Sequence, residues 1–432
     1  MMITKLSGST KQGILNNLLK RSPNNYSAYE KTVSEIIDRV RREGDRALFD
    51  YTLKFDGFAL QPENIRVTKE EIAAAYEQLD EQLIRVIRRS AENIRAFHAR
   101  QLRNSWFDAK EDGTILGMKI TAIEKAGVYV PGGKAAYPSS VLMNIIPAKV
   151  AGVSEIIMTT PPGPDGRVNP GTLVAADIAG VDAIYRAGGA QAIAAMAFGT
   201  ASVPKVDKIT GPGNIFVALA KKAVYGYVSI DSIAGPSEIL VLADETANPR
   251  YIAADLLSQA EHDELASAIL ITTSEKLAEE VSRQVDLFLN ELSRKEILQK
   301  SLDNYGYILL AENMGEALDA VNEIASEHLE ILTANPFETM TKVRNAGAIF
   351  LGEYASEPLG DYFAGPNHIL PTNGTAKFFS PVNVDDFIKK TSIISYSREA
   401  LERVYKDVAL FAESEGLTAH ANSVKVRFED GK

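Results

Sequence analysis

The sequence of 432 residues contains no cysteine. A chain without thiols forms neither disulfides nor iron–sulfur clusters nor cysteine-rich zinc sites, and its chemistry cannot use a cysteine nucleophile. This composition fits the reducing cytoplasm, which is the location we expect. Histidine is also scarce, at five residues. Each imidazole close to acidic residues therefore raises a specific question about metal binding or proton transfer.

Excess positive charge and long apolar runs are missing as well. The chain has 46 lysines and arginines against 57 acidic residues, a net charge of −11, and phosphate binding needs a basic face. A membrane span needs about 20 apolar residues, whereas the longest candidate, residues 141–153, is interrupted by Asn144, Pro147 and Lys149. Residues 1–21 lack the apolar core of a secretory signal. We therefore expect neither a nucleic-acid partner nor a membrane partner.

The length exceeds what one hydrophobic core usually organises, so two or more domains are expected. Residues 70–104 have apolar side chains three and four apart, which predicts a long amphipathic helix with His98 on its solvated surface. From residue 127 onward, short β-branched runs alternate with helical patterns, which is typical of parallel α/β layers. The predicted strands cover residues 127–130, 155–158, 183–185, 206–209, 239–242, 268–271, 307–310, 330–332 and 348–351.

Three glycine-rich turns each follow a predicted strand and precede a predicted helix. They lie at residues 131–134 (PGGK), 187–190 (AGGA) and 211–214 (GPGN). Free backbone N–H groups at such helix N-termini suit a phosphate or a carboxylate. None of the three is a G-x-G-x-x-G sequence, and no P-loop occurs, so by themselves they are a weak indication of nucleotide binding.

Gln259 and His262 are three residues apart in a helical segment and so share one face of the helix. Neutral histidine is a common zinc ligand, and an amide oxygen is a weak one. A hydrogen-bonding pair on a helix surface is the simpler interpretation. Asp361 and His420 are further candidate ligands in loop-like sequence, and His368 competes with His420. Spacing alone does not choose between them.

Glu327 and His328 stand side by side at the end of a helical pattern that begins near Met314. A carboxylate beside an imidazole gives two proton acceptors of different basicity, which suits two distinct proton transfers. Alternatively, His328 only offsets the dipole of the helix C-terminus.

Residues 230–239 (IDSIAGPSEI) and 253–262 (AADLLSQAEH) resemble the signature of the histidinol dehydrogenase family. The resemblance runs in matched order from about residue 126 to the C-terminus. Further matching segments are residues 129–133 (YVPGG), 188–191 (GGAQ), 211–214 (GPGN), 326–329 (SEHL), 360–361 (GD), 367–371 (NHILP) and 417–422 (LTAHAN).

The resemblance implies an activity and a set of residues. The family oxidises L-histidinol through L-histidinaldehyde to L-histidine, the final step of histidine biosynthesis, with two NAD and one zinc ion per site. The zinc ligands fall on Gln259, His262, Asp361 and His420, and the two proton acceptors on Glu327 and His328. Substrate contacts fall on Ser237, His328, Glu415 and the four metal ligands, and cofactor contacts on Tyr129, Gln191 and Asn214.

The resemblance also implies an α/β fold with two incomplete Rossmann-like parallel-sheet domains, small helical N- and C-terminal parts, and an intertwined homodimer. On this basis we expect an N-terminal helical extension at residues 1–25 and a second Rossmann-like domain at 129–237. Residues 26–128 and 238–382 would form one discontinuous domain that carries most zinc-binding and catalytic residues. The helical tail, residues 383–432, would place Glu415 and His420 in the partner subunit's site.

Within this interpretation His328 is the base for alcohol oxidation. Glu327 activates water for the aldehyde step, because no cysteine is present to form a thiohemiacetal. Three alternatives remain at this stage. A related zinc- and NAD-dependent dehydrogenase could act on another amino alcohol. A zinc hydrolase would usually carry H-E-x-x-H, which this chain lacks. A non-catalytic nucleotide-binding protein leaves the adjacent Glu327 and His328 unexplained.

Overall fold

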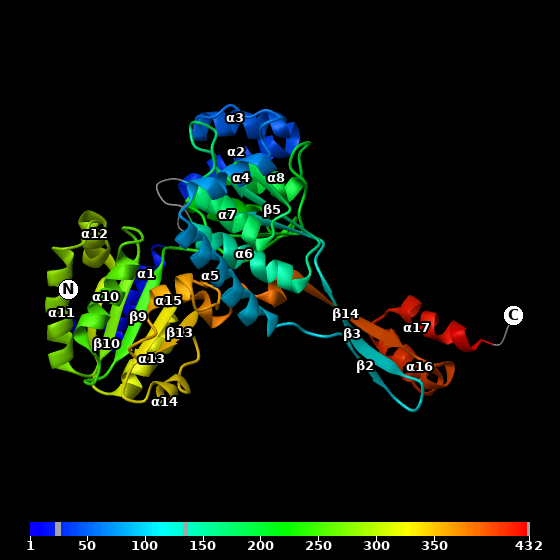
Figure 1. The fold of residues 1–432 in the computed structure, drawn as a ribbon. Coiled ribbons are helices and arrows are strands. Elements are labelled where there is room, and N and C mark those ends of the chain that lie inside the picture. The colour runs from blue at the N-terminus through cyan, green and yellow to red at the C-terminus, as the bar shows by residue number, and fades with distance from the viewer. Residues whose placement is uncertain (22–26, 133–136, 430–432) are drawn as a thin grey trace. The chain divides into compact units, whose positions relative to one another are not determined.

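The computed structural model describes residues 1–21, 27–132 and 137–429 (Figure 1). The chain divides into two compact units. The larger unit comprises Met1–Gln101 and Ile123–Phe387, and the smaller one comprises Leu102–Ala122 and Ile388–Lys432. The larger unit contains two parallel sheets with helices on both faces, and the smaller unit contains a three-stranded sheet and a helical tail.

The first sheet of the larger unit has six strands, all parallel. Its central strands, EILVLA and SAILIT, are buried at every position, as expected for a sheet covered on both faces. In spatial order the strands are β1 (Ile3–Lys5), β11 (Gly306–Leu310), β10 (Ser267–Thr272), β9 (Glu238–Ala243), β12 (His328–Leu332) and β13 (Ala348–Leu351).

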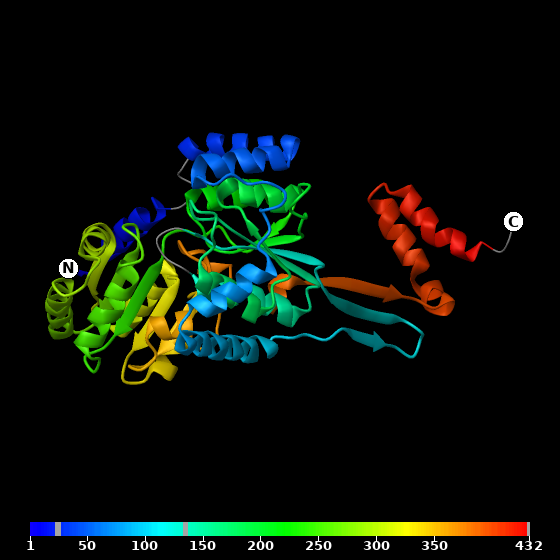
Figure 2. The same ribbon diagram turned by 45° about the horizontal axis from the view of Figure 1, so that its top comes forward.

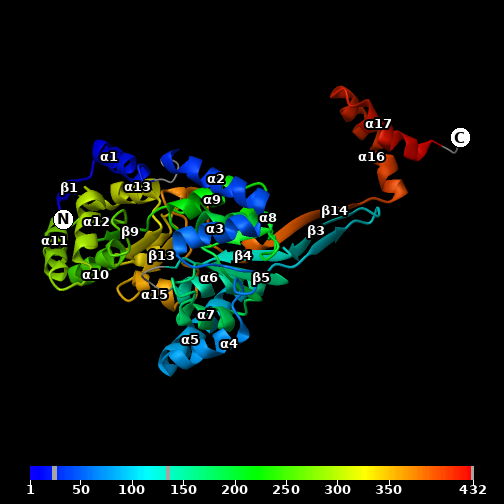
Figure 3. The same ribbon diagram turned by 90° about the horizontal axis from the view of Figure 1, so that it is seen from above.

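Helices cover both faces of this sheet (Figure 3). The apolar cluster on one face includes side chains from α10 (Pro249–Ala260), α11 (Glu275–Leu289) and α12 (Lys295–Tyr305). The cluster on the opposite face includes side chains from α1 (Gly8–Leu19) and α13 (Met314–Ile324). Two short helices, α14 (Pro336–Met340) and α15 (Glu357–Tyr362), follow β12 and β13 respectively.

The second sheet has five parallel strands, in the order β6 (Ala183–Arg186), β5 (Glu155–Thr160), β4 (Lys125–Tyr129), β7 (Lys208–Thr210) and β8 (Ser229–Ile230). One face packs against α2 (Ser27–Glu43), α3 (Asp45–Asp56), α8 (Gly189–Phe198) and α9 (Ile215–Val224). The other face is covered by α6 (Pro138–Ala151) and α7 (Pro170–Ala179), with α4 (Lys69–Gln78) and α5 (Glu81–Ala99) packed outside them (Figure 2).

The smaller unit is antiparallel. Strand β3 (Ile115–Ala122) pairs with β2 (Trp106–Ala109) on one side and with β14 (Ile388–Ser395) on the other. The chain then forms α16 (Arg398–Ser414) and α17 (Thr418–Lys425), which pack together.

The predicted α/β class with parallel sheets is confirmed, and each of the nine predicted strands overlaps an observed one. Two predictions for the chain ends differ from the structure. The N-terminal segment is not only helical, because Ile3–Lys5 pairs with β11 as an edge strand. The C-terminal segment is not only helical either, because it contains β14. Three residues are too few to show an alternating pattern, and β14 has no buried face that would mark it as a strand.

The predicted helix at residues 70–104 is two helices. It breaks at Asp80, whose carboxylate accepts the backbone N–H of Gln82 and starts α5. His98 is fully buried rather than solvated, and its Nδ1 lies 2.8 Å from Gln101 Oε1. The predicted solvated position of His98 is therefore wrong.

The predicted grouping of residues 26–128 with 238–382 also differs from the packing. Helices α2 to α5 pack against α6, α7, α8 and α9, and β4 is the central strand of the five-stranded sheet. Amphipathic helices show that they cover a sheet but not which sheet they cover. The boundary at residues 25 and 26, and Gly133 and Lys134 of the first glycine-rich turn, lie outside the described residues.

No helix in the described part of the chain is long and apolar enough to cross a membrane.

Candidate active site

The predicted catalytic residues lie at the amino ends of the six-stranded sheet. His328 is the first residue of β12, and Glu238 is the first residue of the neighbouring β9. The two strands pair in parallel, with His328 opposite Ile239. Ligands of open α/β sheets usually bind at the carboxyl ends of strands. This cluster is therefore at the opposite edge from the one that the fold class alone suggests.

Backbone groups of Glu238 hold both predicted proton acceptors. Its N–H donates to Glu327 Oε2 at 2.8 Å, and its carbonyl oxygen lies 3.0 Å from His328 Nδ1. Glu327 and His328 are 7% and 3% exposed, respectively. Helix α13 ends at Ile324 with Ala325 in the left-handed region, so His328 lies in a strand, and the interpretation that it only offsets a helix dipole is wrong.

The hydrogen bond to the Glu238 carbonyl fixes the tautomer of His328. A carbonyl can only accept, so Nδ1 carries the proton in the neutral ring and Nε2 keeps a free lone pair. Nε2 is buried and has no hydrogen-bond partner among the described residues, and Asp361 Oδ1 lies 3.7 Å from it. An imidazole in this state can accept a proton from a bound molecule.

The two acceptors have strongly shifted pKa values. Burial raises the pKa of Glu327 to about 8, against the opposing effects of His328 and of the Glu238 N–H. Burial lowers the pKa of His328, but Glu327 and Asp361 outweigh it and raise the pKa to about 10. The side chains lie 3.7 Å apart, from His328 Nδ1 to Glu327 Oε2, so they titrate as a pair.

Three candidate metal ligands meet close to this pair. His262 follows the C-terminus of α10, and α15 presents Glu357 and Asp361 one turn apart. One ligand atom from each of the three lies within 4.8 Å of the other two. The pKa of Asp361 is lowered to about 2, because His328 and His368 outweigh the effect of its burial. Asp361 thus offers a metal ion an anionic carboxylate oxygen, beside the imidazole of His262.

Gln259 provides a test of whether these residues fit a metal ion. The side chain is 1% exposed, and neither its Oε1 nor its Nε2 has a hydrogen-bond partner among the described residues. Leaving a buried amide without partners costs about 1–3 kcal/mol. An oxygen donor at this position, together with an imidazole and a carboxylate, matches the ligands that zinc takes. The residues present fit the predicted ion.

His368 and His420, the two competing candidate ligands, have different surroundings in the structure. Both ring nitrogens of His368 are occupied, since Nδ1 lies 3.0 Å from the Asp361 backbone oxygen and Nε2 lies 3.2 Å from Ser140 Oγ. His368 therefore supports the Asp361 backbone in this arrangement. His420 lies in α17 of the smaller unit and is exposed to solvent, as is Glu415 at the end of α16.

Glu357 is a site residue that we did not predict from the sequence. It is 2% exposed, its Oε2 accepts the hydroxyl of Ser258 at 2.9 Å, and its Oε1 has no partner among the described residues. Burial raises its pKa to about 7, and the Asp361 carboxylate adds to that shift. Its backbone N–H donates to Glu330, another buried acid whose pKa burial raises well above the usual value. Glu357 is four residues before Asp361 on the same short helix, a spacing that could have indicated it, whereas Glu330 comes from β12 and no spacing links it to them.

The predicted cofactor contacts lie on the other sheet, at the carboxyl ends of its strands. Tyr129 ends β4, Gln191 lies in the first turn of α8 after β6, and Asn214 caps α9 after β7. Tyr129 is buried, which raises its pKa to about 12, and its hydroxyl accepts the Gly189 N–H at 3.2 Å. Asn214 Oδ1 accepts the N–H groups of Phe216 and Val217.

The turn at residues 211–214 is held by a buried ion pair. Asp231 accepts the Gly211 N–H at 2.8 Å, Lys221 donates to the Gly211 carbonyl at 2.9 Å, and Lys221 pairs with Asp231. Gly211 has φ of +122°, and a Cβ atom there would collide with the backbone of Tyr129. Glycine is needed at this position.

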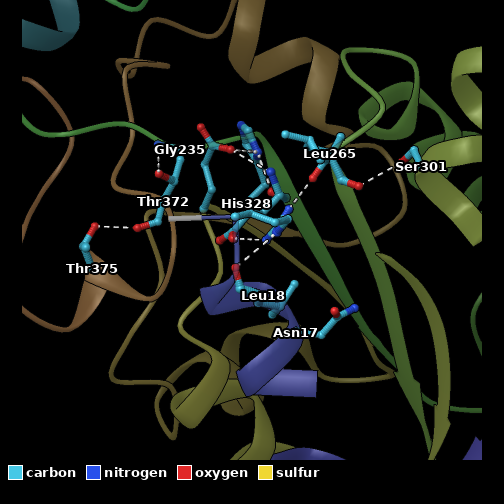
Figure 4. Close-up of polar contacts among 12 residues, drawn as sticks. Asn17, Leu18, Gly235, Leu265, Ser301, His328, Thr372 and Thr375 are labelled. Carbon is cyan, nitrogen blue, oxygen red and sulfur yellow. Dashed lines mark hydrogen bonds and ion pairs between the residues drawn. The ribbon is translucent and has the colours of Figure 1, made fainter. Parts of the chain in front are cut away.

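The remaining predicted substrate contact, Ser237, directly precedes Glu238 at the start of β9. The loop before it is fixed by Gly235, whose N–H donates to the Thr372 hydroxyl at 2.7 Å, and Thr375 donates to the Thr372 carbonyl (Figure 4). The Ser237 carbonyl accepts the N–H of Ser267. Ser237 thus lies next in sequence to the residue that holds Glu327 and His328.

Comparisons with known proteins identify the family of the chain. Residues 19–428 match the family model described as histidinol dehydrogenase. A histidinol dehydrogenase of Clostridium acetobutylicum is 58% identical over 399 residues, 92% of each chain, and one of Bacillus subtilis is 56% identical over 397 residues, again 92% of each. The crystal structure of histidinol dehydrogenase from Elizabethkingia anophelis superposes with a TM-score of 0.94 at 38% identity, covering 99% of this chain and 98% of that one. The chain therefore belongs to the histidinol dehydrogenase family of oxidoreductases.

Proposed function

We propose that this protein carries out the zinc-dependent, four-electron oxidation of L-histidinol to L-histidine through L-histidinaldehyde, with two NAD, as the final step of histidine biosynthesis in the cytoplasm. One observation carries the proposal. The buried pair of Glu327 and His328, held by the backbone of Glu238, lies beside the donor atoms of His262, Glu357 and Asp361.

The metal-binding part of the proposal assigns Gln259, His262 and Asp361, with His420 of the partner subunit, as zinc ligands. Zinc bound there would fix the orientation of the imidazole and amine nitrogens of the substrate, which are good ligands for it. The buried amide of Gln259, which has no partner within the described ranges, supports this assignment. Tyr129, Gln191 and Asn214 are proposed to contact NAD, which supplies hydride acceptance.

In the first oxidation His328 takes the hydroxyl proton. In the neutral ring Nε2 can accept, because Nδ1 donates to the Glu238 carbonyl. Since the pKa of His328 is raised to about 10, this form is the minor one below that pH and the oxidation speeds up as the pH rises toward it. As the O–H bond breaks, its electron pair forms the carbonyl, and bound NAD would accept the hydride that leaves the carbinol carbon. Ser237 and Glu415 of the partner subunit are proposed to contact the substrate and keep that carbon aligned.

The second oxidation needs water, because the chain has no cysteine to form a thiohemiacetal. Glu327 as a carboxylate takes a proton from water while the water oxygen adds to the aldehyde carbon, and His328 returns the proton it took in the first oxidation to the carbonyl oxygen, which gives a gem-diol. His328 then accepts a hydroxyl proton of the diol as the second hydride leaves for the second NAD. The product is the carboxylate of L-histidine.

The proposed assembly is an intertwined homodimer in which the C-terminal segment completes the neighbour's site. The smaller unit exposes large apolar side chains from both its sheet and its helices, as expected of a surface that another chain covers. They include Trp106, Phe107, Ile394, Leu410 and Phe411.

A second candidate is a dehydrogenase of this type that acts on another amino alcohol. Both candidates are tested by measuring NADH formed per alcohol consumed, for L-histidinol and for other amino alcohols, with and without a chelator. We expect two NADH per L-histidinol and loss of turnover on chelation. Preference for another amino alcohol would favour the second candidate, and one NADH per product would contradict the four-electron reaction.

A further inference from the structure

Arg21, at the C-terminal end of α1, is a buried arginine with all three guanidinium nitrogens engaged. Nη2 lies 2.6 Å from Glu238 Oε1, Nη1 donates to the Leu265 carbonyl at 2.6 Å, and Nε donates to the Leu18 carbonyl at 3.4 Å (Figure 4). The ring of Tyr305 lies 4.9 Å from the guanidinium carbon. The side chains of Arg21 and Glu238 are 0% and 3% exposed, so this ion pair is shielded from water.

Glu238 connects this ion pair to the catalytic pair. Its side chain binds Arg21, its N–H donates to Glu327 Oε2, and its carbonyl accepts from His328 Nδ1. One peptide segment thus aims both proton acceptors. A displacement of Glu238 at the start of β9 would move Glu327 and His328 together.

A buried ion pair is a poor source of stability, because the loss of hydration can exceed the attraction, and apolar residues of similar volume often stabilise a fold as well. The planar guanidinium of an arginine can nevertheless fix the positions of its partners, because its N–H donors have a fixed geometry. Here the Arg21 guanidinium links Glu238 at the start of β9 to the end of α1 and to the connection between β9 and β10. Catalysis is sensitive to such placement, and a shift of about 1 Å can cost about 10²-fold in rate.

We propose that Arg21 and Glu238 are positioning residues, which act on the reaction through Glu327 and His328 without contacting the substrate. This inference rests on the proposed function, because it takes Glu327 and His328 as the proton acceptors. Neither Arg21 nor Glu238 belongs to the residues that we predicted from the sequence.

The charge of Glu238 affects the pKa of Glu327, so its removal should change the pH dependence of the reaction, which a loss of packing alone would not do. Among the effects that shift the pKa of Glu327, burial raises it most, His328 and the Glu238 N–H lower it, and the Glu238 carboxylate raises it further. Substitution of Glu238 by glutamine removes that negative charge but keeps the backbone groups. The pKa of Glu327 should therefore fall, and the acidic limb of the pH–rate profile should move to lower pH.

The experiment uses the zinc-loaded full-length enzyme. The variants are Arg21→Lys, Arg21→Met, Glu238→Gln and the double variant Arg21→Met with Glu238→Gln. Arg186→Met is the matched control, because Arg186 is another buried arginine that binds backbone carbonyls and a glutamate, but on β6 of the five-stranded sheet. Thermal stability, KM, kcat and the pH dependence of kcat are measured with L-histidinol and with L-histidinaldehyde.

The wild-type enzyme is measured first. If it does not form two NADH per L-histidinol, the proposed function fails, and the positioning role is not what failed. Given that result, we expect Arg21→Met to lower kcat by about 10²-fold with KM little changed, and Arg21→Lys to restore part of the loss. Glu238→Gln should shift the acidic limb to lower pH, and Arg186→Met should change stability without that shift.

The double variant separates positioning from stability. It has no unpaired buried charge, so its thermal stability should recover, while kcat stays low because the guanidinium anchors are absent. Recovery of kcat together with stability would overturn the proposal. A pH profile unchanged by Glu238→Gln would overturn it as well, and that variant keeps an amide in place of the carboxylate, so it is expected to fold.

Discussion

The two parallel sheets of the larger unit carry their candidate ligand-binding residues at opposite ends of their strands. In the five-stranded sheet, Tyr129, Gln191 and Asn214 follow the carboxyl ends of strands, where ligands of this fold class usually bind. In the six-stranded sheet, Glu238 and His328 begin their strands, and the candidate metal ligands, such as Asp361, lie beside them. The five-stranded sheet offers backbone turns and helix N-termini, and the six-stranded sheet offers buried acids and imidazoles.

The difference follows from what each end of a parallel sheet provides. The carboxyl ends lead into helix N-termini, whose free N–H groups suit phosphates without titratable side chains. The amino ends receive the C-termini of helices, such as α10, which brings Gln259 and His262 to this edge. Proton transfer and metal binding need side chains rather than backbone N–H groups. These functions can therefore be located at the amino ends of the strands, where a dinucleotide does not bind.

The comparison is tested most strongly by Glu327→Gln. Because the amide cannot take a proton from water, we expect oxidation of L-histidinaldehyde to slow by about 10²–10⁴-fold. Oxidation of L-histidinol to the aldehyde and binding of NAD should persist. The two steps are measured separately in single-turnover experiments, with Glu338→Gln, an exposed glutamate on α14, as the control. Equal loss in both steps would contradict the division of labour between Glu327 and His328.

Much of this arrangement could be predicted from the sequence. Buried strands such as EILVLA are predictable from their apolar composition. The family resemblance indicated Glu327, His328 and Asp361, which the fold brings together. Local patterns could not show which sheet α2 to α5 cover, because their apolar faces fit either sheet. They also could not find Arg21, whose importance depends on a contact 217 residues away.

A second test concerns Glu357, which faces the metal-type residues. We expect Glu357→Gln to weaken zinc binding by about 10–100-fold, the usual effect of losing a carboxylate that supports a metal site. Zinc affinity is measured by competition with a chromophoric chelator, and the visible spectrum of the cobalt-substituted protein reports the ligand geometry. Unchanged affinity and an unchanged spectrum would remove Glu357 from the site.

The five-stranded sheet is tested by Gly211→Ala. The added Cβ would collide with the backbone of Tyr129 and take a φ of +122°, a strain of about 1–3 kcal/mol. We expect weaker NAD binding by calorimetry and unchanged zinc binding. Gly226→Ala is the matched control, since its φ is +100° but a Cβ there would meet nothing within 4 Å. If zinc and NAD binding fell together, the two sheets would not act separately.

The smallest effect that we expect is on pH dependence. Glu327 acts as a carboxylate, and burial raises its pKa to about 8. Below that pH the ionised fraction falls about tenfold per unit, so the aldehyde step should rise with pH up to about 8 and then level off. A rate already constant from pH 6 upward would show that another group activates the water.

The central claim is that the chemistry takes place at the amino ends of the six-stranded sheet, with the cofactor held at the carboxyl ends of the five-stranded one. A crystal structure with zinc, NAD and L-histidinol tests it most directly. We expect zinc on Gln259, His262 and Asp361, the substrate hydroxyl within hydrogen-bonding distance of His328 Nε2, and NAD against the turn at residues 211–214. Zinc or substrate bound at the carboxyl ends of the six-stranded sheet would contradict the claim.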